Sequence, residues 1–216
     1  MRTRNLIAVL LSIFGVFALL LVVYYLTNTP KKTDFPEVNQ ILKTDHVKWA
    51  ANSKNLLVEY SDFQCPACRN FEEFIKKEIE ASNSGGFEIT KKTAFIFRHF
   101  PLYTIHPNAF ESAYAAEAAG LQGKFYEMAD LLFSKQDQWT KSQNSKDEFV
   151  KLAASLGLDT KKFKKDMDSK EVKDKVEADL TSGEKANINA TPTFFLNGKK
   201  IEPASLEEFK KLLISL

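Results

Sequence analysis

Cys65 and Cys68 are the only two cysteines of the 216-residue chain, and they are separated by Pro66 and Ala67. A disulfide that serves stability usually closes a long loop, because there it restricts the unfolded chain most. A two-residue spacer closes almost no loop. We therefore expect the pair to take part in a reaction rather than to stabilise the fold.

Such a pair can be a redox dithiol, half of a zinc site or an incidental pair of buried cysteines. A structural zinc ion takes four protein ligands, and the chain has no second cysteine pair. The three histidines, His46, His99 and His106, have no partner histidine three to five residues away. Because the chain offers too few ligands for such a zinc site, the redox interpretation is favoured over the other two.

Cys65 is expected where a strand gives way to a helix. Unpaired backbone N–H groups and the positive end of the helix dipole stabilise a thiolate there. Pro66 suits the first helical position, where no N–H is needed. Cys68 lies one turn further along, within reach of Cys65. We expect an exposed Cys65 to attack the substrate and a shielded Cys68 to resolve the mixed disulfide.

The elements around the pair predict a βαβ unit. Residues 55–60 favour a strand that leads directly to Cys65, and residues 46–50 favour a shorter one. Apolar side chains then recur at helical spacing (Phe71, Phe74, Ile75 and Ile79). Residues 93–100 predict a second strand whose unbroken apolar run is typical of a strand covered on both faces. At this spacing the two strands should be parallel.

The rest of the chain predicts a helical block and a return to strands. Residues 107–188 are largely helical in pattern, and residues 191–202 contain two short apolar runs around an Asn197-Gly198 hairpin turn. Residues 205–216 predict a final amphipathic helix with a capping box. The expected fold class is therefore α/β, with a helical insertion at about 105–188.

The N-terminal segment differs from the rest in composition. Leu6 to Leu26 contains no charged residue, and a helix of this length spans roughly 31 Å, the thickness of a bilayer core. We expect residues 1–26 to form an uncleaved membrane anchor rather than a cleaved signal, 27–43 a linker and 44–216 the folded domain.

Charge excludes one class of partner. The chain carries 30 basic and 28 acidic residues, and removing Arg2 and Arg4 leaves 28 of each beyond residue 30. A domain without net positive charge is not expected to bind nucleic acid through bulk electrostatics.

Two segments together resemble the DsbA-like branch of the thioredoxin superfamily. They are LLVEYSDFQCPACRNFEEF (56–74) and NINATPTFFLNGKKIE (187–202), with helices inserted between them. The resemblance implies a thioredoxin fold with a helical insertion and thiol–disulfide exchange with exported proteins. It also implies a domain outside the cytoplasmic membrane of a bacterium, held there by the N-terminal helix.

The resemblance assigns roles to further residues. Thr191-Pro192 resembles the family's cis-proline, which lies against the cysteines and offers backbone groups to an extended substrate; the alternative is a trans proline that begins an edge strand. Glu59 matches a buried acid that exchanges a proton with Cys68; the alternative is a strand residue that reaches solvent. Asp62 is expected to be a turn or cap residue.

Some aromatic and histidine side chains are left with open roles. His99 and His106 are placed equally well near the active site or as strand-end and helix-cap residues. Tyr103, Tyr114 and Tyr126 are expected mostly in the core, and some aromatic residues could line an apolar groove for unfolded substrate.

The function expected from these residues is thiol:disulfide oxidoreduction by a membrane-anchored enzyme, with an oxidase favoured. No cofactor is required, and a membrane redox partner must reoxidise the pair. The alternatives are an extracytoplasmic reductase or isomerase, kept reduced by another membrane protein, and a non-catalytic tethered binding module on a thioredoxin scaffold.

Ala67 leads to a prediction about the reduction potential. Strongly oxidising members of the family have histidine at this position, whereas alanine can neither donate a side-chain hydrogen bond nor carry a charge. We expect a milder oxidant than those members, and Ala67→His should move the potential towards more oxidising values. Equilibration with glutathione measures this, and an unchanged potential in the variant would count against the prediction.

Overall fold

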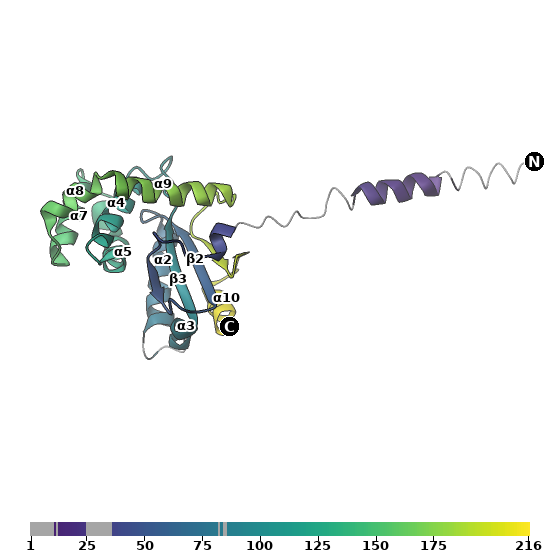
Figure 1. Ribbon diagram of the computed structural model, residues 1–216, viewed down its shortest axis with the longest axis horizontal. Helices are drawn as coiled ribbons and strands as arrows, with labels where there is room; N and C mark the ends of the chain where they lie inside the picture. The colour runs from purple at the N-terminus through teal and green to yellow at the C-terminus, as the bar shows by residue number, and fades with distance from the viewer. Residues whose placement is uncertain (1–10, 12, 25–35, 82, 84–85) are drawn as a thin grey trace, which may run out of the picture. The chain divides into compact units, whose positions relative to one another are not determined.

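The computed structural model describes Leu11 and residues 13–24, 36–81, 83 and 86–216 (Figure 1). The chain forms two compact units, Met1–Asp34 and Phe35–Leu216. The second unit contains the expected domain 44–216 together with the last part of the expected linker 27–43. Residues 27–35 of that linker lie outside the described residues.

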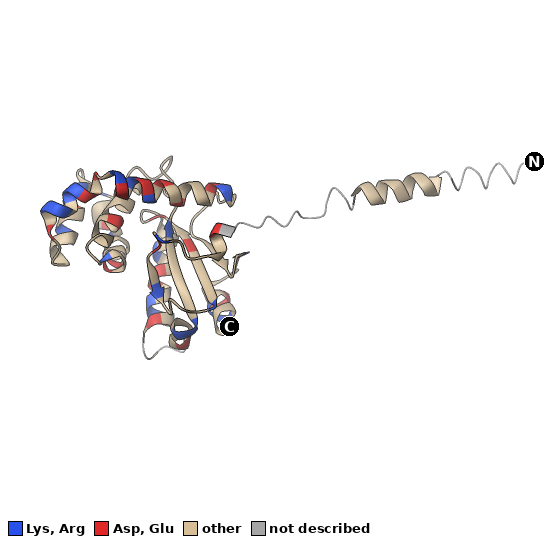
Figure 2. Cartoon of the chain, viewed as in Figure 1, with Lys and Arg blue, Asp and Glu red and all other residues tan. Residues whose placement is uncertain are grey.

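The first unit corrects the expected membrane location. Leu11 and residues 13–24 are helical and uncharged (Figure 2), while residues 1–10, 12 and 25–26 of the expected anchor lie outside the described residues. Within the described part of the chain, no helix is long and apolar enough to cross a membrane. This finding contradicts the predicted single-pass location in the cytoplasmic membrane, and an N-terminal transmembrane helix is not found among the described residues.

Five strands of the second unit form one sheet in the order β1-β3-β2-β4-β5. Their bounds are Val47–Trp49 (β1), Asn55–Ser61 (β2), Thr93–His99 (β3), Thr193–Leu196 (β4) and Lys199–Ile201 (β5). β2 and β3 are parallel, which confirms the predicted βαβ unit, and the other pairs are antiparallel. Asn197 and Gly198 have positive φ angles of 50° and 76° in the β4–β5 turn, as the predicted hairpin requires.

The connection between β2 and β3 packs on one face of the sheet. α2 (Pro66–Phe74) continues into a π-helical segment, η2 (Ile75–Glu80), and the short α3 (Phe87–Lys92) precedes β3. The C-terminal helix α10 (Leu206–Ile214) lies on the same face and is capped by the Ser205 hydroxyl. Leu57 of β2 packs here with Ile75, Ile79 and Phe209.

The opposite face is covered by a long helix and by the start of the domain. The other set of β2 side chains (Leu56, Val58 and Tyr60) packs with Leu180 of α9 (Lys170–Lys185). Val38 of the 3₁₀ helix η1 (Pro36–Asn39) is fully buried in the same cluster. The strict alternation along β2 decides which side chains face α2 and which face α9.

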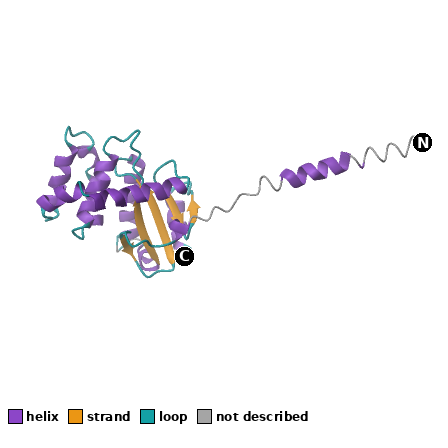
Figure 3. Cartoon of the chain, turned by 45° about the horizontal axis from the view of Figure 1, so that its top comes forward, coloured by secondary structure: helices purple, strands orange, loops and turns teal. Residues whose placement is uncertain are grey.

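The predicted helical insertion is confirmed between β3 and β4, and its helices gather at one side of the sheet (Figure 3). Before α9 come α4 (Ala109–Gly120), α5 (Phe125–Ser134), α6 (Gln136–Trp139), α7 (Ser145–Ser155) and α8 (Thr160–Met167). Their core contains Trp139, Phe149 and Phe163. It continues without a break to Phe63, Cys65 and Cys68, so the insertion and the cysteine pair share one apolar cluster.

A buried ion pair attaches the start of the domain to the sheet. The Arg98 guanidinium of β3 donates to both carboxylate oxygens of Asp45, at 3.1 and 2.8 Å, and neither side chain is exposed. It also donates to the carbonyl oxygens of Glu37 and Gln40 at 2.6 and 3.0 Å. One side chain therefore neutralises a buried carboxylate and satisfies two backbone acceptors.

Arg98→Met is expected to lower the free energy of unfolding by about 3–5 kcal/mol, because it removes the bidentate partner of the buried Asp45 carboxylate and leaves only Lys175, whose Nζ lies 3.6 Å from Asp45 Oδ1. The matched control is Arg69→Met, since Arg69 pairs with the exposed Asp137 and should lose no more than about 1 kcal/mol. Urea unfolding monitored by circular dichroism measures both values. Equal losses in the two variants would contradict the role given to Arg98.

Candidate active site

Cys65 stands at the N-terminus of α2, directly after the turn that leaves β2. It is the N-cap residue with extended backbone angles, and Pro66 occupies the first turn of the helix. The Cys65 N–H donates to the Asp62 carbonyl at 3.0 Å. Cys65 is 7% exposed and Cys68 fully buried. Cys65 is thus less exposed than expected, while Cys68 is shielded as expected.

The two thiols have opposite acidities. The hydrogen bond from the Cys68 thiol is the largest cause that lowers the pKa of Cys65 to about 5; burial opposes it, and the backbone N–H groups of Cys68 and Ala67 add to it. Burial, together with its hydrogen bond to Cys65, raises the pKa of Cys68 well above its ordinary value. At neutral pH the pair therefore holds one thiolate, on Cys65, and one thiol, on Cys68.

The Thr191-Pro192 peptide bond is cis, and it lies beside the cysteine pair. β4 runs antiparallel to β2 with Thr193 opposite Tyr60, so the residues just before β4 reach the end of β2 where Cys65 follows. Cys65 Sγ lies 3.5 Å from the Thr191 carbonyl oxygen. The buried Thr191 hydroxyl has no hydrogen-bond partner within the described part of the chain.

The turn before Cys65 is held by a loop that follows β3. The Asp62 carboxylate accepts hydrogen bonds from the N–H groups of Gln64 and Leu102 and from His106 Nδ1, at 2.7, 2.8 and 2.8 Å. Asp62 is therefore a turn residue, as expected, and it also binds the loop 101–108. His106 therefore lies near the active site, which decides between the two locations that the sequence left open for this histidine.

His99 has a different place. Its Nε2 bonds to Glu117 Oε1 at 2.8 Å, and His46 Nε2 bonds to Glu117 Oε2 at 2.9 Å. The two histidines hold the pKa of the Glu117 carboxyl at about 2, against the opposing effect of burial. This bridge joins α4 to β3 and to the segment before β1, and the His99 ring also lies 5.8 Å from the ring of Phe63 in the turn before Cys65.

Glu59 lies on β2 and is almost completely buried. Burial and the neighbouring Glu72 carboxyl raise its pKa to about 8, and its charge in turn raises the pKa of Cys68. The expected burial is present, and the alternative of a side chain that reaches solvent does not apply. Glu59 is therefore mostly protonated at neutral pH.

Glu72 is a second buried acid that sequence reasoning missed. It lies one turn beyond Cys68 on α2, and burial raises its pKa to about 7. Lys48 opposes this shift, since its Nζ lies 4.0 Å from Glu72 Oε1 and 2.6 Å from Glu80 Oε1. The position four residues after Cys68 was a signal that could have placed it on the same helical face.

One exposed apolar pair corrects the sequence analysis. Tyr103 and Ile105 are 57% and 69% exposed, whereas Tyr103 was expected in the core; Tyr126 is buried enough to donate its hydroxyl to His46 O at 2.6 Å. Both exposed side chains belong to the loop 101–108 that Asp62 binds.

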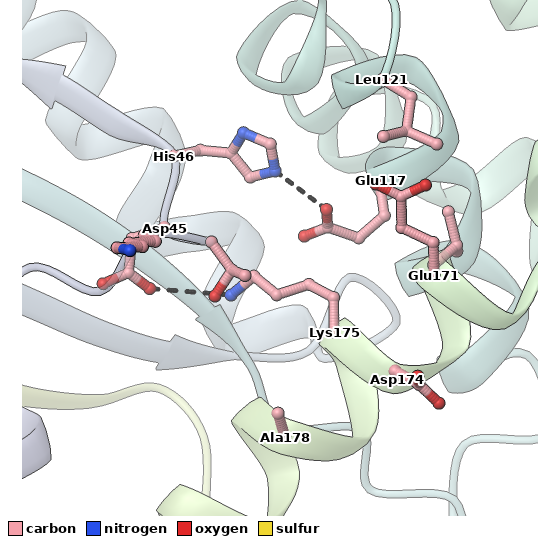
Figure 4. A pocket seen from close by; sticks show the side chains of 11 residues that line it. Asp45, His46, Glu117, Leu121, Glu171, Asp174, Lys175 and Ala178 are labelled. Atoms are coloured by element: carbon pink, nitrogen blue, oxygen red, sulfur yellow. Dashed lines mark hydrogen bonds and ion pairs between the residues drawn. The ribbon is translucent and has the colours of Figure 1, made fainter.

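A pocket of about 620 Å³ lies elsewhere, between the segment before β1 and the helices α4 and α9 (Figure 4). Asp45, His46, Glu117 and Lys175 line it, and Lys175 also pairs with Asp179 at 2.6 Å. None of the expected redox residues lines this pocket, so it is separate from the cysteine pair.

A family description and solved structures agree with this geometry. The model of the thioredoxin family matches residues 42–214, and the chain belongs to that family. α-DsbA1 of Wolbachia pipientis has a TM-score of 0.68 at 23% identity, with 85% of this chain and 96% of that chain covered. Oxidised BdbD of Bacillus subtilis has a TM-score of 0.66 at 22% identity, with 82% and 95% covered. The predicted DsbA-like fold with its helical insertion is confirmed.

Curated relatives are much longer proteins. The Na(+)/H(+) antiporter NhaA 1 of Mycolicibacterium vanbaalenii is 38% identical over 158 residues, which are 71% of this chain and 23% of that protein. Its counterpart in Mycolicibacterium gilvum is 36% identical over 160 residues, 72% of this chain and 24% of that protein. The chain thus spans about a quarter of the length of these relatives, and antiport is a property of the longer proteins.

Cys68→Ala should raise the pKa of Cys65 in the reduced protein, because it removes the donor that stabilises the thiolate. The absorbance of the thiolate at 240 nm as a function of pH measures this, with a half-point near 5 expected for the unaltered protein. Because folding lowers this pKa, the ionised thiol stabilises the reduced fold above the unfolded pKa, and the contribution is lost as pH falls through about 5. A half-point that stays near 5 in Cys68→Ala would contradict the assignment.

Proposed function

We propose that the chain is a thiol:disulfide oxidoreductase that uses Cys65 and Cys68 and acts mainly as a disulfide-forming oxidase. The observation that supports this best is the asymmetry of the pair: a thiolate-forming Cys65 at the tip of α2 beside a buried, protonated Cys68. A lowered pKa stabilises the reduced form and makes Cys65 a good leaving group, and both effects favour the transfer of disulfides to substrates.

The proposed reaction begins with the Cys65–Cys68 disulfide. A substrate thiolate attacks Cys65 Sγ, the Cys65–Cys68 bond breaks, and Cys68 leaves with the electron pair and takes a proton. A second substrate thiolate then attacks the substrate sulfur of the mixed disulfide and displaces Cys65 as a thiolate. Two electrons pass from the substrate to the protein, and a redox partner must remove them; the resemblance implies a membrane protein for that step.

The cis Thr191-Pro192 segment is the proposed substrate-binding element. Its carbonyl lies 3.5 Å from Cys65 Sγ, so an extended chain paired with this backbone would present its own sulfur to Cys65. The exposed side chains of Tyr103 and Ile105 offer an apolar surface on the loop 101–108, which the Asp62 carboxylate binds. Unfolded or reduced proteins expose apolar segments of this kind, and exported proteins are the class that the resemblance implies.

The pKa of about 5 also supports an oxidant of intermediate strength. A reactive thiol in thioredoxin has a pKa near 7 and that of DsbA about 3.5. Ala67 supplies only its backbone N–H to Cys65. The pair is thus proposed as more oxidising than thioredoxin and milder than the strongest oxidases.

Oxidative refolding of a reduced, unfolded protein that contains native disulfides tests the proposal. The oxidised chain should restore its disulfides, and Cys65→Ser and Cys68→Ser should each abolish this activity, because neither variant can form the Cys65–Cys68 disulfide that supplies the oxidising equivalents. Activity that is unaffected by Cys65→Ser would eliminate an enzymatic role of this site, and a chain without activity in this assay would be better described as a non-catalytic binding module. Thiol trapping in cells separates the remaining alternative, since a mostly reduced pair would indicate a reductase or isomerase.

Glu59→Gln is expected to slow the step in which Cys68 gains or loses its proton, because the amide cannot exchange one. The rate at which Cys68 resolves a mixed disulfide should rise with pH towards about 8 in the unaltered protein, and the variant should lose that dependence and about 10²-fold in rate. Stopped-flow release of a fluorescent peptide thiol measures both.

The matched control for this variant is Glu73→Gln, an exposed carboxyl on the same helix as Cys68. It should leave both the rate and the pH profile unchanged. A Glu59→Gln profile that matches the unaltered protein would remove Glu59 from the mechanism.

A further inference from the structure

A buried amide of the helical insertion contacts the active-site turn directly. Gln136 begins the short helix α6 and is 4% exposed. Its Nε2 donates hydrogen bonds to the carbonyl oxygens of Phe63 at 2.7 Å and Cys65 at 3.1 Å. One side-chain amide therefore binds the residue that carries the reactive sulfur and the residue two positions before it.

The position of Gln136 is itself held firmly. Trp139 of the same helix is buried, and its indole N–H donates to the Leu132 carbonyl of α5 at 2.7 Å. The Thr140 hydroxyl donates to the Gln136 carbonyl at 2.6 Å. α6 is therefore fixed on α5, and the Gln136 amide reaches the turn from a rigid support.

The hydrogen bonds have an electrostatic consequence for Cys65. A carbonyl oxygen carries partial negative charge, and an amide donor offsets that charge when it binds there. The Cys65 carbonyl also accepts from Arg69 N at 3.2 Å, as an N-cap carbonyl does, so Gln136 is a second donor to this oxygen. Without it, partial negative charge next to the thiolate would be less compensated in a mostly buried site.

We propose that Gln136 is a positioning residue for the redox reaction. Through the Phe63 and Cys65 carbonyl oxygens it holds Cys65 at the tip of α2, near the Thr191 carbonyl, and favours the thiolate form. The proposal rests on the proposed function only in taking Cys65 as the attacking sulfur. It assigns to the insertion a direct part in setting the reactivity of the cysteine pair.

The test compares Gln136→Met and Gln136→Glu with Gln138→Met as the matched control. Methionine keeps the length of the side chain and removes the donor, whereas a glutamate carboxylate also adds negative charge next to the two carbonyl oxygens. Gln138 is an exposed glutamine on the same helix. The readout is the pH dependence of the rate at which iodoacetamide alkylates the reduced protein. Mass spectrometry checks that one label is attached and that it is attached at Cys65.

Gln136→Met should move the half-point of alkylation upwards by about one pH unit, and Gln136→Glu should move it further once the carboxyl ionises. The equilibrium constant against glutathione should shift towards the oxidised protein by up to about tenfold. Gln138→Met should change neither quantity. Circular dichroism confirms that each variant is folded before its thiols are titrated.

An unshifted half-point in a folded Gln136→Met variant overturns the proposal, as does an equal shift in Gln138→Met. Failure of both Gln136 variants to fold also overturns it, because the residue would then be required for the fold rather than for reactivity. Alkylation needs no substrate turnover, so these results stand apart from the refolding assay. A protein that lacks refolding activity, but in which Cys65 and its Gln136 variants titrate as expected, would contradict the proposed function and leave the role of Gln136 standing.

Discussion

A buried Cys68 thiol that donates to the Cys65 sulfur is the interaction on which the rest of the site depends. It stabilises one thiolate and, by the same hydrogen bond, discourages ionisation of its own sulfur. The asymmetry survives only if Cys68 stays out of water. Burial is supplied by the cluster that joins the cysteine pair to the helical insertion, so the chemistry of the pair depends on packing contributed from beyond the βαβ unit.

The turn from Asp62 to Cys65 shows how the insertion reaches the site. Asp62 binds the loop 101–108 through its carboxylate, Gln64 accepts from the Asn108 N–H at 2.8 Å, and Phe63 packs against Phe97 with ring centroids 4.8 Å apart. A thioredoxin sheet alone would leave this turn open on one side. Here side chains of the turn accept from backbone N–H groups of the loop 101–108, and the Gln136 amide satisfies the carbonyl oxygens of Phe63 and Cys65.

Two buried acids, Glu59 and Glu72, lie behind the pair with raised pKa values of about 8 and 7. The Glu72 carboxyl hinders ionisation of Glu59, and Lys48 partly offsets the effect of burial on Glu72. This arrangement places an acid that can change protonation near neutral pH close enough to Cys68 to raise the pKa of that thiol. The cost of burying these groups is consistent with a functional site, where such shifts are concentrated.

Local patterns in the sequence determined the reactive pair, the βαβ unit, the β4–β5 hairpin and the helical character of the insertion, because spacing, periodicity and turn chemistry are short-range properties. The roles of Thr191-Pro192 and Glu59 were also predicted from the sequence, because the family resemblance assigned them. Only the tertiary structure decided what contacts the turn: Gln136 and His106 come near it through packing of segments that no local pattern relates. The exposure of Tyr103 and the separate bridge of His46, His99 and Glu117 were decided in the same way, because burial depends on the neighbours that long-range packing supplies.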